Sequence, residues 1–216
     1  MIKWIIFDAM GVIFIVGDDT NDLLVPFIQG HNKRILKKTI NEVYLRASLG
    51  QITSRQFWQE VGLGAQYPQI ETVYLDTQLI LDDGFTSVAR MMSKQYSLAL
   101  LSNDVSEWSA YLRNRFAMDF LDVFVISGDI HCRKPDLNIY KRFLKEAGTQ
   151  AGECVFIDDR CKNLAVAKSM GFKTIYFVRQ PKKSDFVPDA SITSFNELEN
   201  AIENICQQII ERVIFY

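Results

Sequence analysis

The sequence predicts an α/β fold, a three-layer parallel sheet with helices on both faces and an inserted helical block. Three observations along its 216 residues lead to this prediction. Short, continuous apolar runs recur and end in polar residues, and segments with helical spacing lie between them. The third observation is that residues 18–83 contain several helical patterns and no strand pattern. Strand alternating with helix is typical of a doubly wound parallel sheet with right-handed crossovers.

The first apolar run, residues 3–7, ends abruptly in Asp8. Continuous apolar runs fit the central strands of a parallel sheet, because both faces of such strands are covered. Four later segments repeat the pattern, the second of them more weakly: 97–101, 123–126, 154–157 and 174–178. The sequence therefore predicts five parallel strands.

Helical spacing predicts the elements between these strands. In residues 85–94, 137–147 and 164–170, apolar side chains recur every three or four positions, which places them on one face of a helix. An amphipathic C-terminal helix, with apolar residues from 195 to 209, is expected to pack on the sheet. The apolar end, 213–216, fits packing on the core or on a second subunit, so a monomer and a homodimer both stay open.

The block after the first strand is predicted to form a cap over the sheet. Asp18 and Asp19 at its start are interpreted as a plain loop, with a flexible gate as the alternative. Thr53 is a suitable N-cap for one of its helices. The helices are expected over residues 20–29, 33–49, 53–61 and 69–81. The predicted division is an α/β core domain of residues 1–17 and 84–216, and a helical cap domain of residues 18–83.

Composition and charge argue against several classes of protein. A formal net charge of −2 with scattered basic residues gives no electrostatic footprint for nucleic acid. No apolar stretch is long enough to span a membrane, and the first residues do not resemble a signal peptide. The four cysteines, at 132, 154, 161 and 206, lack the close spacing of a zinc or redox motif. We therefore expect reduced thiols in a cytoplasmic protein.

Polar residues follow three of the predicted strands where those strands end. Asp8 follows the first strand, Ser102 and Asn103 follow the second, and Asp158 and Asp159 stand at the end of the fourth. In open parallel sheets the ligand binds in the crevice beyond the carboxyl ends of the strands. These side chains are therefore expected to converge on one site. The adjacent carboxylates repel each other, which favours a cation nearby.

Four separated motifs resemble those of the haloacid dehalogenase (HAD)-like hydrolase superfamily in order, spacing and placement at strand ends. They are FDAMGV at 7–12, LSN at 101–103, RKPD at 133–136 and FIDD at 156–159. The resemblance extends from residue 5 to residue 177. Within the superfamily, the sequence resembles the branch that includes the N-terminal phosphatase domain of soluble epoxide hydrolase. It implies a three-layer Rossmann-like, HAD-like core with an inserted helical cap domain.

The resemblance also implies phosphoryl transfer with Mg²⁺ as the cofactor. Asp8 is implied as the nucleophile that forms an aspartyl-phosphate. Asp8, Asp159 and the backbone carbonyl of Met10 are implied as metal ligands, with Asp158 as a further ligand or directly behind them. Mg²⁺ prefers oxygen ligands of this kind.

The substrate implied by the resemblance is a small phosphorylated metabolite. Lys134 is implied to present a positive charge to Asp8 and to the transferring group. The Ser102 hydroxyl and the Asn103 backbone N–H are implied to hold phosphoryl oxygens, with Met10 beside the substrate. Positioning and electrostatic stabilisation carry most of phosphoryl-transfer catalysis.

Met10 departs from the family pattern, because the family's phosphatases normally have an aspartate there as general acid and base. A thioether cannot donate or accept that proton, and general acid–base catalysis is typically worth about 10²–10⁴-fold. Three hypotheses follow, in this order: a phosphatase lacking the usual acid/base residue, a 2-haloacid dehalogenase that uses Asp8 as nucleophile, and a catalytically impaired HAD-like binding protein. A halide leaves without protonation, but metal-free dehalogenases of the family lack the Asp158–Asp159 pair.

Overall fold

The sheet of the protein is parallel throughout. The computed structural model describes residues 1–179 and 184–214, with side chains up to residue 211, so the apolar end 213–216 lies outside the described side chains. Within these residues six strands lie in the order β3-β2-β1-β4-β5-β6. Their bounds are Trp4–Phe7 (β1), Ser97–Ser102 (β2), Val123–Ile126 (β3), Cys154–Asp158 (β4), Lys173–Phe177 (β5) and Ala190–Ile192 (β6). The predicted parallel sheet is confirmed, and each of the five predicted strands lies within one residue of its expected bounds.

The β6 strand was not predicted from the sequence. It has only three residues and pairs with β5 at the edge of the sheet. A three-residue edge strand is too short to carry a hydrophobic pattern that stands out from loop sequence.

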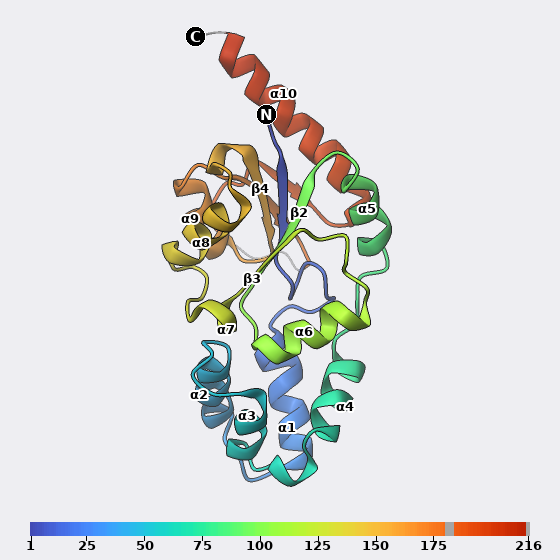
Figure 1. The fold of residues 1–216 in the computed structure, drawn as a ribbon, viewed down its shortest axis with the longest axis vertical. Coiled ribbons are helices and arrows are strands. Elements are labelled where there is room, and N and C mark those ends of the chain that lie inside the picture. The colour runs from blue at the N-terminus through green and yellow to red at the C-terminus, as the bar shows by residue number, and fades with distance from the viewer. Residues whose placement is uncertain (180–183, 215–216) are drawn as a thin grey trace.

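Helices cover both faces of the sheet, which makes the three predicted layers (Figure 1). Along β1, Ile6 packs into the core beneath α8 (Leu137–Ala147) and α9 (Cys161–Ser169). Its neighbours Ile5 and Phe7 point the other way, into the core that includes residues of α5 (Phe85–Met92) and α10 (Leu198–Ile214). Successive side chains of a strand alternate between faces, so a continuous apolar run fills both cores.

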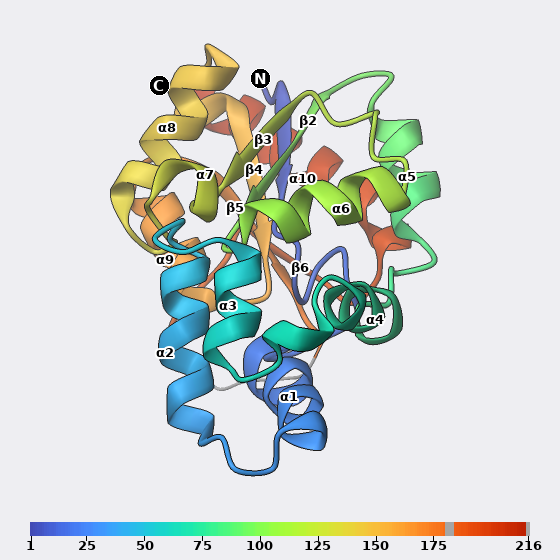
Figure 2. The same ribbon diagram turned by 60° about the horizontal axis from the view of Figure 1, so that its bottom comes forward.

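The inserted block is helical, and it lies beyond the carboxyl ends of the strands (Figures 1 and 2). Three predicted helices need correction at their bounds. The helix expected over 69–81 ends at Gln78, because Ile80 and Asp82 pair instead with the segment that leaves the sheet. The helix expected from residue 33 begins at Lys37, because Leu36 is still extended, and the segment 20–29 is divided into two helices. The bounds are α1 Val25–His31, α2 Lys37–Ala47, α3 Ser54–Glu60 and α4 Gln69–Gln78, with a 3₁₀ turn at Gly64–Gln66.

The interpretation of Asp18 and Asp19 as a plain loop was wrong. Asp19 begins a π-helix, Asp19–Leu24, labelled η1 here, which runs directly into α1. Asp18 is its N-cap, and its carboxylate accepts a hydrogen bond of 3.2 Å from the Asn21 backbone N–H. The π-helix is rare and is often found at functional sites.

The two chain segments that connect the sheet to the inserted helices run side by side. The Ile15 N–H donates to the Ile80 carbonyl and the Asp82 N–H to the Ile13 carbonyl, both at 2.9 Å. Arg179 ties this pair of segments to the end of β5, since its guanidinium donates to the carbonyls of residues 11 and 12 and pairs with Asp82 at 2.6 Å.

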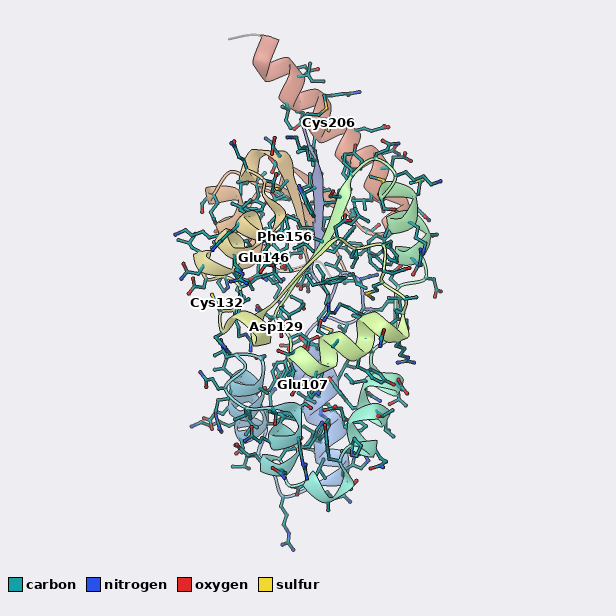
Figure 3. The ribbon with its side chains drawn as sticks, in the orientation of Figure 1. Glu107, Asp129, Cys132, Glu146, Phe156 and Cys206 are labelled. Carbon is teal, nitrogen blue, oxygen red and sulfur yellow. The ribbon has the colours of Figure 1, made fainter. Side chains whose placement is uncertain are left out.

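A helix that the sequence did not predict, α6 (Ser106–Arg115), spans the boundary between sheet and block. Its Glu107, labelled in Figure 3, accepts a 3.1 Å hydrogen bond from the Ser54 N–H at the start of α3. Its other end also contacts the block, since Arg115 donates to the carbonyls of Leu75 and Asp76 in α4. All four cysteines are free thiols. None of the helices in the described ranges combines the length and apolar character that a membrane span requires.

Candidate active site

Asp8 stands at the first position after β1. Its backbone N–H continues the sheet by donating to the Ile157 carbonyl at 2.9 Å, so the strand register fixes where the side chain begins. One carboxylate oxygen accepts a 2.7 Å hydrogen bond from the Ala9 N–H. The residue is only 6% exposed. A buried carboxylate needs compensating partners, and those partners define the site.

Lys134 supplies the opposite charge. Its Nζ lies 2.7 Å from Asp8 Oδ1 and 2.9 Å from Asp158 Oδ2, and it donates to the Leu101 carbonyl at 2.7 Å. The side chain of Asn103 holds the backbone on both sides of Lys134, accepting from its N–H at 2.7 Å and donating to its carbonyl at 3.0 Å. Three segments far apart in the sequence therefore meet at one ammonium group.

Three carboxylates gather beside it. Ligand atoms of Asp8, Asp158 and Asp159 all lie within 4.8 Å of one another. The two oxygens of Asp158 already accept hydrogen bonds, one from the Arg160 N–H at 2.7 Å and the other from Lys134 and from Asn163 Nδ2, both at 2.9 Å. Asp158 therefore holds Lys134 and the turn after β4.

Gly11 fits against one of these carboxylates. Its φ is +87°, and a Cβ there would lie 2.4 Å from Cγ of Asp159 and 2.6 Å from Oδ2. Only glycine lets the backbone adopt this conformation and approach so closely. The loop that carries Asp8 and Met10 therefore packs directly against the Asp159 side chain.

The electrostatics of Asp8 also suit a cation. Burial and the nearby charges of Asp158 and Asp159 raise the pKa of Asp8 well above its ordinary value, and Lys134 lowers it. A nucleophilic carboxylate must be ionised. Three clustered oxygen donors match the preference of Mg²⁺ for hard ligands, and a divalent cation would favour the ionised form.

Ser102 ends β2 and is 1% exposed. Its Oγ has no hydrogen-bond partner among the residues that the structure describes, and the same is true of Asn163 Oδ1. Buried polar atoms are nearly always hydrogen-bonded, so an unpartnered hydroxyl at a strand end is consistent with a place for a ligand oxygen.

A small cavity of about 30 Å³ lies between the strand ends and the inserted helices. Asp8, Met10 and Asn103 line it from the sheet side, whereas Asp19 and Tyr44 line it from the helices. Arg133, Arg160, Asn163 and Thr20 complete the lining. This volume holds about one water molecule. A phosphate ester is larger, so the cavity must widen before such a ligand binds.

Six lining residues were not predicted as site residues, and three of them are charged: Asp19, Arg133 and Arg160. The last two directly adjoin Lys134 and Asp159 in the chain, which is the signal that could have identified them. Asp19 is 8% exposed, and its carboxylate lies 3.3 Å from both the Tyr44 hydroxyl and Arg160 Nη2. No feature of the sequence around Asp19 distinguishes it from an ordinary loop aspartate.

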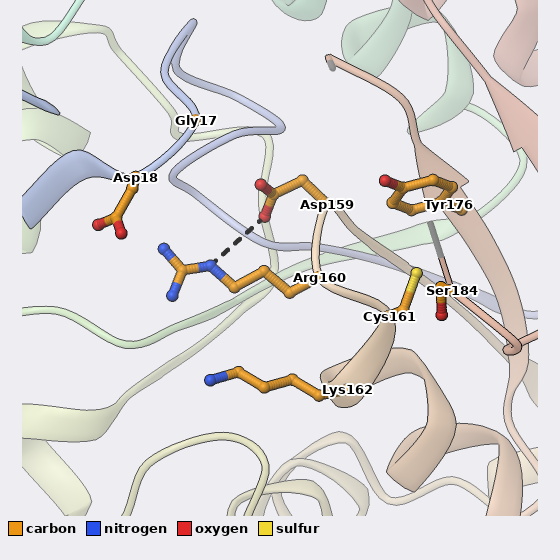
Figure 4. Close-up of a pocket in the computed structure, with 8 residues that line it drawn as sticks. All are labelled: Gly17, Asp18, Asp159, Arg160, Cys161, Lys162, Tyr176 and Ser184. Atoms are coloured by element: carbon orange, nitrogen blue, oxygen red, sulfur yellow. Dashed lines mark ion pairs between the residues drawn. The ribbon is translucent and has the colours of Figure 1, made fainter. Parts of the chain in front are cut away.

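A larger outer cavity of about 320 Å³ is lined by Asp159 and Arg160, and Arg160 also lines the inner cavity. Figure 4 shows Arg160 extended beside Asp159, at 3.8 Å between Nε and Oδ1, with the Asp18 and Lys162 side chains on the same side of the cavity. Tyr176 and Cys161 lie across from them. Arg160 therefore stands between the inner cavity and the outer one.

Comparison with known proteins identifies the class that this fold and site define. The family of haloacid dehalogenase-like hydrolases matches residues 2–171. The chain belongs to this family and is a hydrolase, as the four sequence motifs predicted.

Two curated relatives are phosphatases. The sesquiterpene phosphatase astK of Aspergillus oryzae is 26% identical over 61% of this chain and 70% of its own length. A glyceraldehyde 3-phosphate phosphatase of Methanocaldococcus jannaschii is 30% identical over 47% of this chain, which spans about half (46%) of that relative. The similarity to soluble epoxide hydrolase domains stays a prediction.

Solved structures agree on the fold. A HAD phosphatase from Thermococcus onnurineus aligns with a TM-score of 0.73 at 19% identity, covering 93% of this chain and 98% of that one. A 2-haloacid dehalogenase from Pseudomonas syringae aligns at 0.68 and 17% identity, covering 94% and 99%. A HAD family enzyme from Bacteroides thetaiotaomicron, solved with magnesium and inorganic phosphate, aligns at 0.68 and 19%, covering 85% and 98%. These likenesses establish the HAD fold and leave the reaction to the residues of the site.

Proposed function

We propose that this hydrolase is a Mg²⁺-dependent phosphatase that acts on a small phosphorylated metabolite through an aspartyl-phosphate on Asp8. The observation that carries the proposal is the 2.7 Å contact between Lys134 Nζ and Asp8 Oδ1 beside the three clustered carboxylates. A nucleophilic carboxylate, a fixed ammonium group and a set of oxygen donors are the parts that this reaction needs.

In the first half of the proposed reaction, an Asp8 oxygen forms a bond to phosphorus while the bond to the ester oxygen breaks. In the second half, water attacks the aspartyl-phosphate, the Asp8–phosphorus bond breaks, and phosphate is released. Lys134 keeps Asp8 oriented and offsets negative charge. The Ser102 hydroxyl and the Asn103 N–H are proposed to hold phosphoryl oxygens.

The proposed metal site consists of Asp8, Asp159 and the Met10 carbonyl, with Asp158 supporting it through Lys134 and Asn163. When bound, Mg²⁺ would offset the charge of the phosphoryl group next to the carboxylate nucleophile. The family's magnesium and phosphate complex and the phosphatase relatives support this assignment. We also propose that residues 18–83 act as a cap domain over a core of residues 1–17 and 84–216, since the inner cavity is lined from both parts.

A 2-haloacid dehalogenase is the second candidate, because Met10 lines the cavity beside Asp8 and a halide needs no proton to leave. The third is a binding protein without turnover. The cluster of Asp8, Asp158 and Asp159 favours the phosphatase, since attack on carbon with loss of halide needs no cation.

One assay separates the three candidates. The protein is incubated with a panel of phosphate esters and 2-haloacids, with Mg²⁺ or with chelator, alongside Asp8→Asn. We expect phosphate release that requires both Mg²⁺ and Asp8. Release of halide at the same rate with and without chelator would support the dehalogenase. Release of neither phosphate nor halide would support the binding protein.

A further inference from the structure

A proton donor is missing from the position where the site needs one. In the first half of the proposed reaction, the leaving alkoxide must gain a proton unless it is very stable. In the second half, the attacking water must lose one. Met10 lines the inner cavity at the place nearest to Asp8 in the chain, and its thioether can do neither.

Asp19 is the second carboxyl group of that cavity. Apart from Asp8, it is the only carboxyl among the described residues that line it, and it comes from the opposite wall. Asp19 is the first residue of the π-helix η1, and Asp18 caps that helix. The side chain is therefore held at a helix end and directed by the backbone rather than by a mobile loop.

Its partners suit proton transfer. The Tyr44 hydroxyl donates to Asp19 Oδ2 at 3.3 Å, and Arg160 Nη2 lies 3.3 Å from Oδ1. Burial and the Asp18 charge raise the pKa of Asp19, while Arg160, Tyr44 and Arg133 lower it. The net effect is a raised pKa, which favours the protonated carboxyl that a general acid needs before it can donate.

We infer that Asp19 is the general acid and base of this hydrolase, in place of the residue that Met10 cannot supply. This inference rests on the proposed phosphatase function. As the ester bond breaks, the Asp19 carboxyl gives its proton to the leaving oxygen and becomes a carboxylate. That carboxylate then takes a proton from the water whose oxygen bonds to phosphorus, which frees Asp8 and restores protonated Asp19.

The experiment compares Asp19→Asn with the matched control Asp22→Asn, which changes an exposed aspartate of the same π-helix. Measured values of kcat/KM for phosphate esters of increasing leaving-group pKa report the first half of the reaction. We expect Asp19→Asn to lose about 10²-fold or more on alkyl phosphates and less than about 3-fold on 2,4-dinitrophenyl phosphate. With the latter ester, we expect a burst of one phenolate per enzyme followed by slow turnover, because water activation is also impaired.

The rescue variant is Met10→Asp in the Asp19→Asn background, which is expected to restore alkyl phosphate hydrolysis. Asp22→Asn is expected to have the same kcat/KM as the unmodified chain for every ester. Calorimetric titration with inorganic phosphate checks that Asp19→Asn keeps a formed site, and Asp19→Ser enters the same assay if the Asn variant does not fold.

Two results would overturn the inference about Asp19 while leaving the proposed phosphatase function in place. An equal loss of kcat/KM at every ester, with no burst, would mean that Asp19 only holds Arg160 in place. No change at any ester, while Asp8→Asn is inactive, would remove Asp19 from the reaction and leave the phosphatase intact. If the unmodified chain releases phosphate from none of the esters, the proposed function itself fails, and the inference fails with it.

Discussion

The two walls of the inner cavity are built differently. On the sheet side, Asp8, Lys134, Asp158 and Asn163 are joined by contacts of 2.7–2.9 Å at strand ends whose register is fixed. On the helix side, Tyr44 reaches Asp19 at 3.3 Å and the Asn103 carbonyl at 3.5 Å, and Arg160 reaches Asp19 at 3.3 Å.

The difference in contact length between the two sides indicates how the closed inner cavity can open for a ligand. Shorter and better-aligned hydrogen bonds are stronger, so the sheet side is preorganised while the contacts across the cavity are easily exchanged for contacts with substrate or water. The proposed nucleophile and metal ligands therefore lie on the side with the shorter contacts, and Asp19, inferred to transfer protons, lies on the side with the longer ones.

The largest effect is expected from Lys134→Met. This change leaves two buried carboxylates without their shared cation, and breaking such a pair typically costs about 3–5 kcal/mol of unfolding free energy. Urea unfolding measures it, and activity is expected to be lost. Lys141→Met, an exposed residue of α8, is the control. Equal free energies of unfolding for Lys134→Met and Lys141→Met would contradict the view that the sheet side is preorganised.

Gly11→Ala is expected to displace Asp159 or the loop after Asp8, because the added Cβ would lie 2.4 Å from the Asp159 carboxyl carbon. We expect a loss of roughly 1–3 kcal/mol in stability and at least about tenfold weaker Mg²⁺ binding, measured by calorimetry. Gly30→Ala is the control, since a Cβ there meets nothing within 4 Å. Undiminished Mg²⁺ affinity in Gly11→Ala would place the metal elsewhere.

Asp104 tests whether the sheet side carries an ionisable group that is costly to charge. It is 2% exposed, and burial raises its pKa to about 8 although the Val105 N–H lowers it. A carboxyl with a raised pKa in the folded state binds more protons folded than unfolded, so its contribution is full below pH about 4 and lost as pH rises to about 8. Asp104→Asn should therefore reduce the loss of stability between pH 5 and 8 by at least about 1 kcal/mol.

The control for that experiment is Asp129→Asn, which changes an exposed carboxylate on the short helix α7 (Ser127–Ile130; Figure 3). Denaturant unfolding at both pH values is the measurement. Because Asp8 and Asp19 also have raised pKa values, the difference between variant and unmodified chain isolates Asp104. Identical pH dependence in all three proteins would contradict the prediction.

The smallest effect is expected from Tyr44→Phe. It removes two long hydrogen bonds and keeps the ring stacked 6.0 Å from Trp108, so less than about 1 kcal/mol should be lost. Tyr140→Phe is the matched change on the sheet side, where the buried hydroxyl donates to the Asn163 carbonyl at 3.0 Å. We expect Tyr140→Phe to lower the thermal unfolding temperature more than Tyr44→Phe does. The reverse order would contradict the conclusion that the contacts on the sheet side are the stronger ones.

The sheet side was largely predictable from the sequence. Apolar runs that end in Asp8, Ser102 and Asp158 fix strand ends, and parallel strands bring those ends to one edge. Lys134 came from the resemblance, because its position depends on a loop held by Asn103 rather than on any periodic pattern.

The helix side was not predictable in the same way. The carboxylate of Asp19 reaches the cavity only because a π-helix replaces a loop and because helices far along the chain enclose it, and neither event leaves a local pattern. The edge strand β6 was not predicted because three residues carry no distinctive pattern, and α6 was not predicted because only Trp108, Ser109 and Leu112 of its ten residues are buried.

The paired connections between sheet and helical block have a consequence for how this architecture can vary. Where the chain leaves the sheet at Ile13 and Ile15 it is already hydrogen-bonded to the returning strand at Asp82 and Ile80. The ends of the insertion are thus closed by their own pairing, and loop-closure entropy grows only slowly with the length enclosed. An insertion of another length is therefore expected to cost little loop-closure entropy at this point, while the paired connections keep the geometry of the strand ends.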